Sequence, residues 1–284
     1  MTTMVRSLAH TRGPSTRTRV LVLVLAVAVP AATVPVLVVD GVLHGHPVMN
    51  GSARGTALVM LAVALPALVA GLRVSSRGSV RGWALLLGAL AYIAYNATLL
   101  VYATPFNALF LVDVALLSLA FWALVSLFAD PLPRLFAGPR LPVRGISTFI
   151  LAIVVLNAAA WLARIVPELG DDPPGFLKGT GLTTNPIFVQ DLAIWLPALA
   201  VVAILLRRGH PAGVLLAGAG LVFWQVEAVG VAVDQWLGQH AAPGSDVATY
   251  GGSVLFVAVA LVTAVPLTLW WRAAPEARGR LLPD

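Results

Sequence analysis

Eight apolar runs dominate this chain of 284 residues, and each is long enough to cross a lipid bilayer as a helix. A helix rises about 1.5 Å per residue, so about 20 apolar residues span the roughly 30 Å hydrocarbon core. Only 11% of the residues are charged, against about a quarter in a soluble domain. We therefore predict an all-α, polytopic bundle forming a single transmembrane domain over 20–272. Its predicted spans are 20–39, 55–72, 82–104, 106–129, 146–166, 186–206, 211–236 and 250–271.

The basic residues predict the orientation of this bundle. All 18 Lys and Arg residues except Arg54, Arg164 and Lys178 lie in the tail 1–19, in alternate loops, or at the end of the chain. By the positive-inside rule both termini are predicted to be cytoplasmic, with basic tails at 1–19 and 273–284. The excess of Arg over Lys indicates a GC-rich bacterial genome, so we predict a cytoplasmic (inner) membrane. A cleaved signal peptide is the alternative for the first run, which is longer than a usual signal core.

The chain divides into two halves of four spans with the same orientation. The third span of each half carries its main polar residue, Asn96 or Glu227, at a similar depth. No clear residue identity relates the halves, and a parallel repeat stays open as an alternative.

Polar residues of spans three to seven gather in the predicted outer half of the membrane. Charged groups there cost about 3 kcal/mol each and normally face the bundle interior or water. Four acids face one base, Arg164, so some acids must be protonated, solvated or paired with a cation. We predict a polar chamber open to the outside, with Asp191 and Glu227 as proton or cation sites and Arg164 as the counter-charge. Its further candidate residues are Asp113, Asn96, Asn185, Gln190, Tyr95 and Asp234.

Two other hypotheses compete with transport or binding of a small molecule or cation. The polar residues can form a purely structural network in an accessory membrane subunit, or Glu227 or Asp191 can serve a membrane-embedded enzyme acting on a lipid-linked substrate. The chain has no cysteine and no P-loop, HExxH, GxSxG or GxGxxG motif, which argues against an enzyme. We predict no cofactor, no metal and no nucleic acid partner; lipid is the main partner, and the oligomeric state is open.

Two segments carry a resemblance. FNALFLVDVALLSLAFWALV (106–125) and GLTTNPIFVQDLAIWLPALAVVAILLRRGHPAG (181–213) resemble an uncharacterised group of multi-pass bacterial membrane proteins. That group often has a polar or aromatic residue at the position of Phe188 and an aromatic one at that of Asp113. The resemblance implies an integral membrane protein and no particular activity, and it lends Asp113 no support as a site residue.

Overall fold

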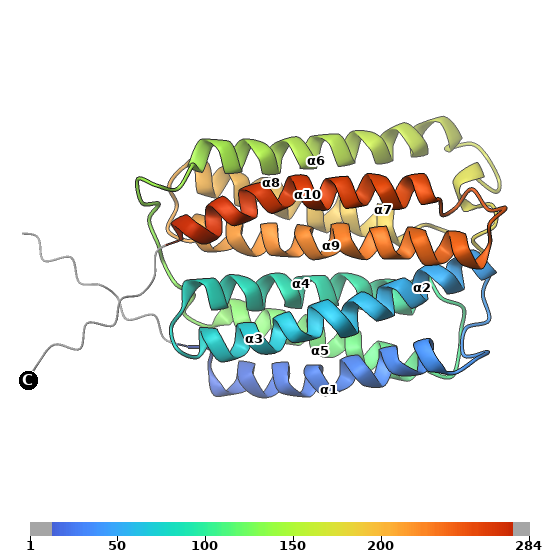
Figure 1. Ribbon diagram of the computed structural model, residues 1–284, viewed down its shortest axis with the longest axis horizontal. Helices are drawn as coiled ribbons and strands as arrows, with labels where there is room; N and C mark the ends of the chain where they lie inside the picture. The colour runs from blue at the N-terminus through green and yellow to red at the C-terminus, as the bar shows by residue number, and fades with distance from the viewer. Residues whose placement is uncertain (1–12, 275–284) are drawn as a thin grey trace, which may run out of the picture.

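The computed structural model describes residues 13–274, which form an elongated bundle of helices and contain no strand (Figure 1). Eight of its helical spans are long and apolar enough to cross a membrane, as predicted for a multi-pass integral membrane protein. The parts of the predicted basic tails before Gly13 and after Ala274 lie outside the described residues. The helices are α1 (Thr16–Val38), α2 (Pro47–Val59), α3 (Leu65–Ser75), α4 (Val80–Tyr102), α5 (Phe110–Ala129), α6 (Val143–Ile165), α7 (Pro186–Gln190), α8 (Leu196–Arg207), α9 (Gly213–Ala241) and α10 (Tyr250–Ala273).

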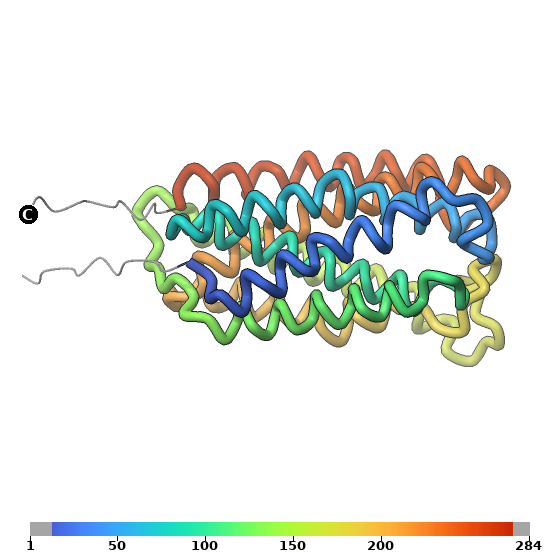
Figure 2. The backbone as a smooth tube through the Cα atoms, turned by 90° about the horizontal axis from the view of Figure 1, so that it is seen from below, coloured from blue at the N-terminus to red at the C-terminus, as the bar shows by residue number. Residues whose placement is uncertain are grey.

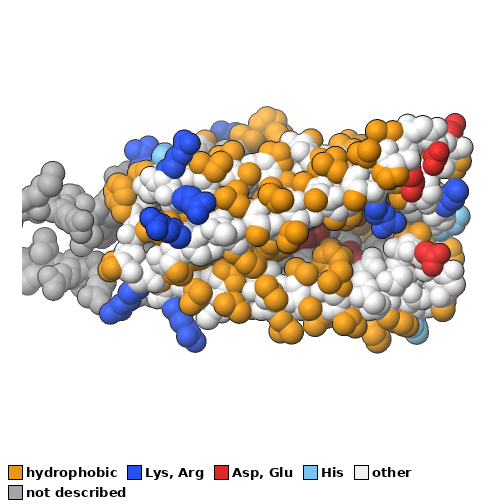
Figure 3. Space-filling view, turned by 90° about the horizontal axis from the view of Figure 1, so that it is seen from above, with side chains coloured by type: hydrophobic (Ala, Val, Ile, Leu, Met, Phe, Trp, Pro, Cys, Tyr) orange, Lys and Arg blue, Asp and Glu red, His pale blue; other side chains and the backbone are white. Residues whose placement is uncertain are grey.

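The two ends of the described chain lie at the same end of the bundle, here called the terminal end (Figure 2). The opposite end is called the distal end. Figure 3 shows basic side chains gathered mainly at the terminal end and acidic ones toward the distal end. This separation of charge fits the positive-inside pattern, which would place the distal end outside. The orientation in the membrane itself stays a prediction.

Helices α4 and α9 form the centre of the bundle and are its most buried spans. They approach closely where Gly88 of α4 meets α9, since a Cβ atom on Gly88 would lie 2.7 Å from the carbonyl oxygen of Ala219. Small residues at such crossings let helix backbones pack against each other where no hydrophobic effect drives association. The polar residues of α4 and α9 are thereby brought to the middle of the molecule.

The second span of each half is broken by a π-helical turn. Met60–Ala64 (η1) separates α2 from α3, and Asp191–Trp195 (η4) separates α7 from α8. Each turn is followed by the same four residues, Leu-Pro-Ala-Leu, beginning at Leu65 and at Leu196. Proline has no N–H to donate and its ring displaces the preceding turn, so a widened turn before it lets the helix continue. Pro66 and Pro197 thus each follow a π-turn.

A spacing of 131 positions relates the second and third spans of the two halves, the same separation that joins Asn96 to Glu227. It maps η1 onto η4, and it maps Gly78 onto Gly209, which turn the chain at φ values of 79° and 67°. The first and fourth spans do not keep this spacing, since α6 begins 127 positions after α1 and α10 begins 140 positions after α5. The second and third spans of the halves are therefore built alike, and a parallel repeat of the whole half stays an open alternative.

The halves differ at the distal end. Helix α2 begins at Pro47, and the equivalent position in the second half is Lys178, but α7 begins only at Pro186. The sixth span therefore lacks about two distal turns, or about 12 Å of helix. A loop replaces them, with 3₁₀ turns at Val166–Glu168 (η2) and Gly175–Leu177 (η3). The second half consequently leaves its interior less covered than the first.

Candidate functional site

Asp191 lies at the start of the π-turn η4 and is almost fully buried, with 5% of its surface exposed. Trp161 of α6 donates a hydrogen bond from its indole nitrogen to Asp191 Oδ2 at 2.8 Å. The side chain of Tyr95, on α4, lies close to the Asp191 side chain. Three helical spans thus meet at one carboxyl group, which the π-turn directs into the bundle.

Aromatic rings surround the same position. Tyr95, Trp195 and Phe223 form a cluster with ring centroids 5.0 to 5.8 Å apart. Gln190 ties this cluster together, because its side chain accepts a bond from the Trp195 indole at 3.3 Å and approaches the Tyr95 carbonyl oxygen at 3.5 Å. Trp161, which donates to Asp191, packs on Phe188 with the two ring centroids 4.7 Å apart. The carboxyl of Asp191 therefore lies beside a group of aromatic rings, one of which donates to it through its indole N–H.

Glu227 of α9 lies near the centre of the bundle but is not closed off. Asn96 Nδ2 donates to its Oε2 at 3.2 Å, and donates also to the Tyr92 carbonyl oxygen at 3.1 Å. The two acids Asp191 and Asp234 lie within electrostatic range of Glu227. Its residue surface is only half-buried, in contrast to Asp191. The glutamate thus has one protein donor and partial access to the space around it.

One face of α9 explains this access. Gly220, Trp224, Glu227 and Val231 are half-buried and follow one another at spacings of four, three and four, which is one face of a helix. This face is turned toward α6, whose only buried residues lie at its terminal end. Figure 3 shows a furrow on this side of the molecule, with acidic side chains visible inside it. We call the space around Glu227, Val231 and Asp191 the recess.

Asp234 lies two turns distal to Glu227 on α9 and faces α2. Thr56 donates to its Oδ2 at 3.0 Å, whereas Oδ1 is buried without a hydrogen-bond partner. Gly55 makes this contact possible, because a Cβ atom there would lie 2.5 Å from Oδ1. The Tyr92 hydroxyl, also buried and unpartnered, lies against Gly230 between Glu227 and Asp234. Two unsatisfied oxygens thus lie along the same helix.

Three predicted site residues stand apart from this group. Asp113 is buried in α5 with 4% of its surface exposed, and its Oδ1 has no partner. Asn185 caps α7 by accepting a bond from the Ile187 N–H at 3.0 Å, which is an ordinary helix start. Arg164 is exposed on α6. None of the four intramembrane acids forms an ion pair with a Lys or Arg among the described residues, and the role of Arg164 as their counter-charge stays a prediction.

Trp161, Thr56 and Trp195 are the contacts that the sequence did not reveal. Each donates to a predicted site residue, yet tryptophan and threonine in an apolar run carry no signal of a polar partner. Trp161 had one usable cue, since it lies three positions before Arg164 and hence at the depth of the acids. Depth can be counted along a helix, but the direction in which a side chain points requires the neighbouring helices.

The chemistry available in the recess is acidic and aromatic. Within residues 13–274 no group of three or more His, Cys, Asp or Glu side chains is suited to a metal ion. Carboxyl groups without a basic partner attract protons or cations, because an isolated buried carboxylate is expensive. Comparisons with family models, with curated proteins and with solved structures found no match. The site is therefore interpreted from its own geometry, and the resemblance to bacterial membrane proteins stays a prediction.

Proposed function

We propose that this protein binds a small organic cation in the recess, as the binding step of transport across a bacterial cytoplasmic membrane. The observation that carries the proposal is that two acids on different helices, Asp191 and Glu227, border the recess and that neither has a basic partner among the described residues. A bound cation would satisfy both. Partial exposure of Glu227 supplies the route by which it would enter.

The aromatic rings favour an organic cation over an inorganic ion. Ammonium groups bind the faces of Trp, Tyr and Phe rings, and this attraction is worth about 2 kcal/mol or more when it is desolvated. Trp224 lies on the same half-buried face of α9 as Glu227, and Trp195 is also half-buried, next to the Gln190 side chain. An inorganic ion would instead require several oxygen ligands in a closed shell, which two carboxyl groups do not supply.

Transport requires that the site open to one side of the membrane and then to the other. The π-turns that interrupt two of the spans are the positions at which the helices would move. A π-turn weakens the regular hydrogen-bond ladder of a helix and often occurs at functional positions. Asp191 is the first residue of such a turn, so its position depends on how α7 meets α8. The terminal half of the same spans is closed by apolar packing around residues such as Leu199 and Leu206. Movement of α7 relative to α8 would therefore shift a charged group toward or away from the recess.

A structural role for the network is the second candidate, and one observation favours it. Each distal acid makes a bond that joins two spans: Asp191 to α6, Glu227 to α4 and Asp234 to α2. Such bonds between membrane helices are worth about 0.6 kcal/mol each on average. A purely structural network needs no water and no ligand, and this difference separates the two candidates experimentally.

Cysteine accessibility tests the proposal, because the chain has no cysteine of its own. Val231→Cys introduces a thiol one turn from Glu227 on the half-buried face, and Ala123→Cys introduces a matched control in the fully buried face of α5. Both proteins are placed in nanodiscs, where each membrane face is accessible, and treated with a charged, membrane-impermeant thiol reagent. We expect labelling at position 231 but not at position 123.

Protection by a cation then distinguishes binding from mere hydration. We expect tetramethylammonium to slow labelling of Val231→Cys, and the protection to disappear when Glu227→Gln is added. A thiol at 231 that stays unlabelled in folded protein would indicate a dry, structural network. Labelling that tetramethylammonium never slows would indicate a hydrated recess without a cation site. Uptake of labelled tetramethylammonium into proteoliposomes then shows whether binding leads to transport.

A further inference from the structure

The terminal ends of α6 and α8 meet at a corner of the bundle that carries exposed arginines. Arg207, the last residue of α8, donates from Nη2 to the hydroxyl of Thr148 on α6 at 3.4 Å. Arg144 lies four residues before Thr148, and all three residues are exposed. Residues four apart share one face of a helix, with Cβ atoms about 5–6 Å apart. Arg144, Thr148 and Arg207 therefore lie close together, and we call them the basic corner.

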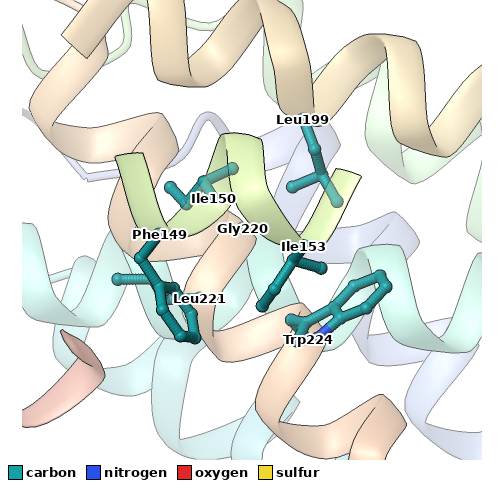
Figure 4. Close-up of a pocket in the computed structure, with 7 residues that line it drawn as sticks. All are labelled: Phe149, Ile150, Ile153, Leu199, Gly220, Leu221 and Trp224. Atoms are coloured by element: carbon teal, nitrogen blue, oxygen red, sulfur yellow. The ribbon is translucent and has the colours of Figure 1, made fainter. Parts of the chain in front are cut away.

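Apolar packing beneath the basic corner fixes the position of α6 against α8. Figure 4 shows Phe149 and Ile150 of α6, Leu199 of α8 and Leu221 of α9 around a hollow of only about 10 Å³. Such a hollow holds about one water molecule, so the three helices are in close contact here. The three buried residues of α6 all lie within its first eight positions. The basic corner thus lies on the part of α6 that the bundle holds firmly.

The positive charge of the basic corner has no acidic partner among residues 13–274. Asp130, directly after α5, is the one acid at the terminal end of this part of the chain. It accepts hydrogen bonds from the Ser15 N–H at 2.9 Å and the Thr18 hydroxyl at 2.8 Å, so it is engaged with α1. Arg208 is exposed beside Arg207 and adds a further charge. A guanidinium has five N–H donors, and that of Arg207 uses one of them, so the others are available to a ligand.

Lipid is the neighbour of the basic corner, because the surface beside it is apolar and exposed. Ile204 lies one turn before Arg207 on α8, and Val201 lies one turn farther from the terminal end. On α6, Val155 lies two turns beyond Thr148. These three apolar residues are between 41% and 63% exposed, within spans that are long and apolar enough to cross a membrane. A molecule that fits here has a charged head at the terminal end and hydrocarbon beyond it.

We propose that the basic corner binds the phosphate group of an anionic membrane phospholipid. The planar fork of a guanidinium matches two phosphate oxygens, which is a geometry that lysine does not offer. Arg207 and Arg144 supply two such forks, one from each helix, and the Thr148 hydroxyl supplies a further donor. The acyl chains then lie over the exposed apolar side chains of α6 and α8. Basic pockets between membrane helices are known sites for anionic head groups.

The charge around the basic corner selects a lipid with a net negative charge. The ammonium group of a zwitterionic lipid would approach Arg144, Arg207 and Arg208, and like charges at close range repel. A bound phosphate would join α6 to α8 through both arginines of the corner. This link would hold a helix that the protein itself covers poorly, since only 6% of the residues in the most apolar stretch of α6 are buried. The inference does not depend on the cation site of the recess.

The experiment titrates phosphatidylglycerol into the full-length protein in neutral detergent and counts the bound lipids by native mass spectrometry. Arg144→Gln with Arg207→Gln removes two charges from the basic corner. Arg73→Gln with Arg77→Gln removes the same charge from exposed positions at the terminal end of α3 and is the matched control. A charge-assisted hydrogen bond contributes about tenfold or more to binding, so the corner variant should bind the first lipid about tenfold more weakly or worse. The control should leave this affinity nearly unchanged.

Several results would overturn the inference. Equal losses in the two double variants would mean that the terminal end attracts anionic lipids only diffusely. Phosphatidylcholine that binds as tightly as phosphatidylglycerol would mean that charge does not select the lipid. Inorganic phosphate that displaces the lipid at equal concentration would mean an anion site in which the acyl chains have no role. If the corner variant does not fold, Arg144→Gln is compared with Arg73→Gln, and equal lipid affinities of these two single variants would likewise refute the site.

Discussion

Replacing both partners of the Asn96–Glu227 contact should lower the free energy of unfolding by less than the sum of the two single replacements. The perturbations are Asn96→Leu, Glu227→Leu and the double variant, each replacing a polar side chain by an apolar one of similar size. The two groups are joined by a single hydrogen bond of 3.2 Å between the central helices α4 and α9. Because the contact is direct, a double-mutant cycle measures it.

The expected magnitudes follow from what each change leaves behind. Asn96→Leu deprives Glu227 of its protein donor, and an unsatisfied buried group costs about 1–3 kcal/mol. Glu227 is half-buried, so water can replace part of this bond, and we expect a cost of about 1 kcal/mol. Glu227→Leu leaves Asn96 bonded to the Tyr92 carbonyl oxygen and removes an acid that costs about 3 kcal/mol in the membrane. That variant should be as stable as the parent or more stable.

The assay is unfolding in mixed micelles of increasing dodecyl sulfate content, with tryptophan fluorescence as the signal. We expect a coupling energy of about 0.6 to 1.7 kcal/mol, the range found for polar contacts between membrane helices. Strictly additive costs would mean that the two side chains do not interact. A large destabilisation by Glu227→Leu would show that the acid holds the helices together, and would favour the structural candidate. Stability gained without the acid would mean that Glu227 is kept for binding.

Two further predictions concern glycines, both measured as the same unfolding midpoint. Gly55→Ala should lower the free energy of unfolding by about 1–3 kcal/mol, because the new Cβ atom would lie 2.5 Å from Asp234 Oδ1 and force α2 away from α9. Gly138→Ala is the control: its Cβ atom would have no neighbour within 4 Å, so the stability should change little. Equal effects of these two changes would mean that α2 and α9 are not in close contact. Gly78→Ala and Gly209→Ala should each lower the free energy of unfolding by about 1–2 kcal/mol, and by similar amounts, because both turns require positive φ. A loss of stability in only one of the two variants would contradict the equivalence of these turns.

The number of spans and the depth of the polar layer follow from the sequence because both depend on counting along a helix. Twenty apolar residues make a span whatever surrounds them, and the steps to Asp191 or Glu227 give their depth. The direction of a side chain around the helix is a different matter. Arg164 and Asp191 were placed at one depth, yet Arg164 is exposed on α6 while Asp191 is buried. Only the neighbours of α6 decide that.

The π-turns that interrupt the second span of each half could not be predicted from the sequence, for a different reason. A π-turn adds one residue to a turn without changing the composition of the helix, so hydropathy does not register it. The Leu-Pro-Ala-Leu stretches after Met60–Ala64 and Asp191–Trp195 are the readable trace of both breaks. Four residues are too few to establish a repeat in an apolar chain, where Leu and Ala recur by composition alone. The equivalence of these spans becomes clear once the turns before the stretches are seen at the same spacing.

The two halves cover the central pair of helices unequally. In the first half α2 extends to Pro47 and packs along α9, so its Gly55 and Thr56 enclose Asp234. The equivalent part of the second half is missing, since α7 starts eight residues later than Lys178, the counterpart of Pro47. The missing helix corresponds to 47–54, a segment that in the first half packs against the distal end of α9, where Gly51 meets Leu237 and Gly238. The difference between the halves therefore lies distal to Glu227, and the access to Glu227 follows instead from α6, whose buried residues are confined to its terminal end.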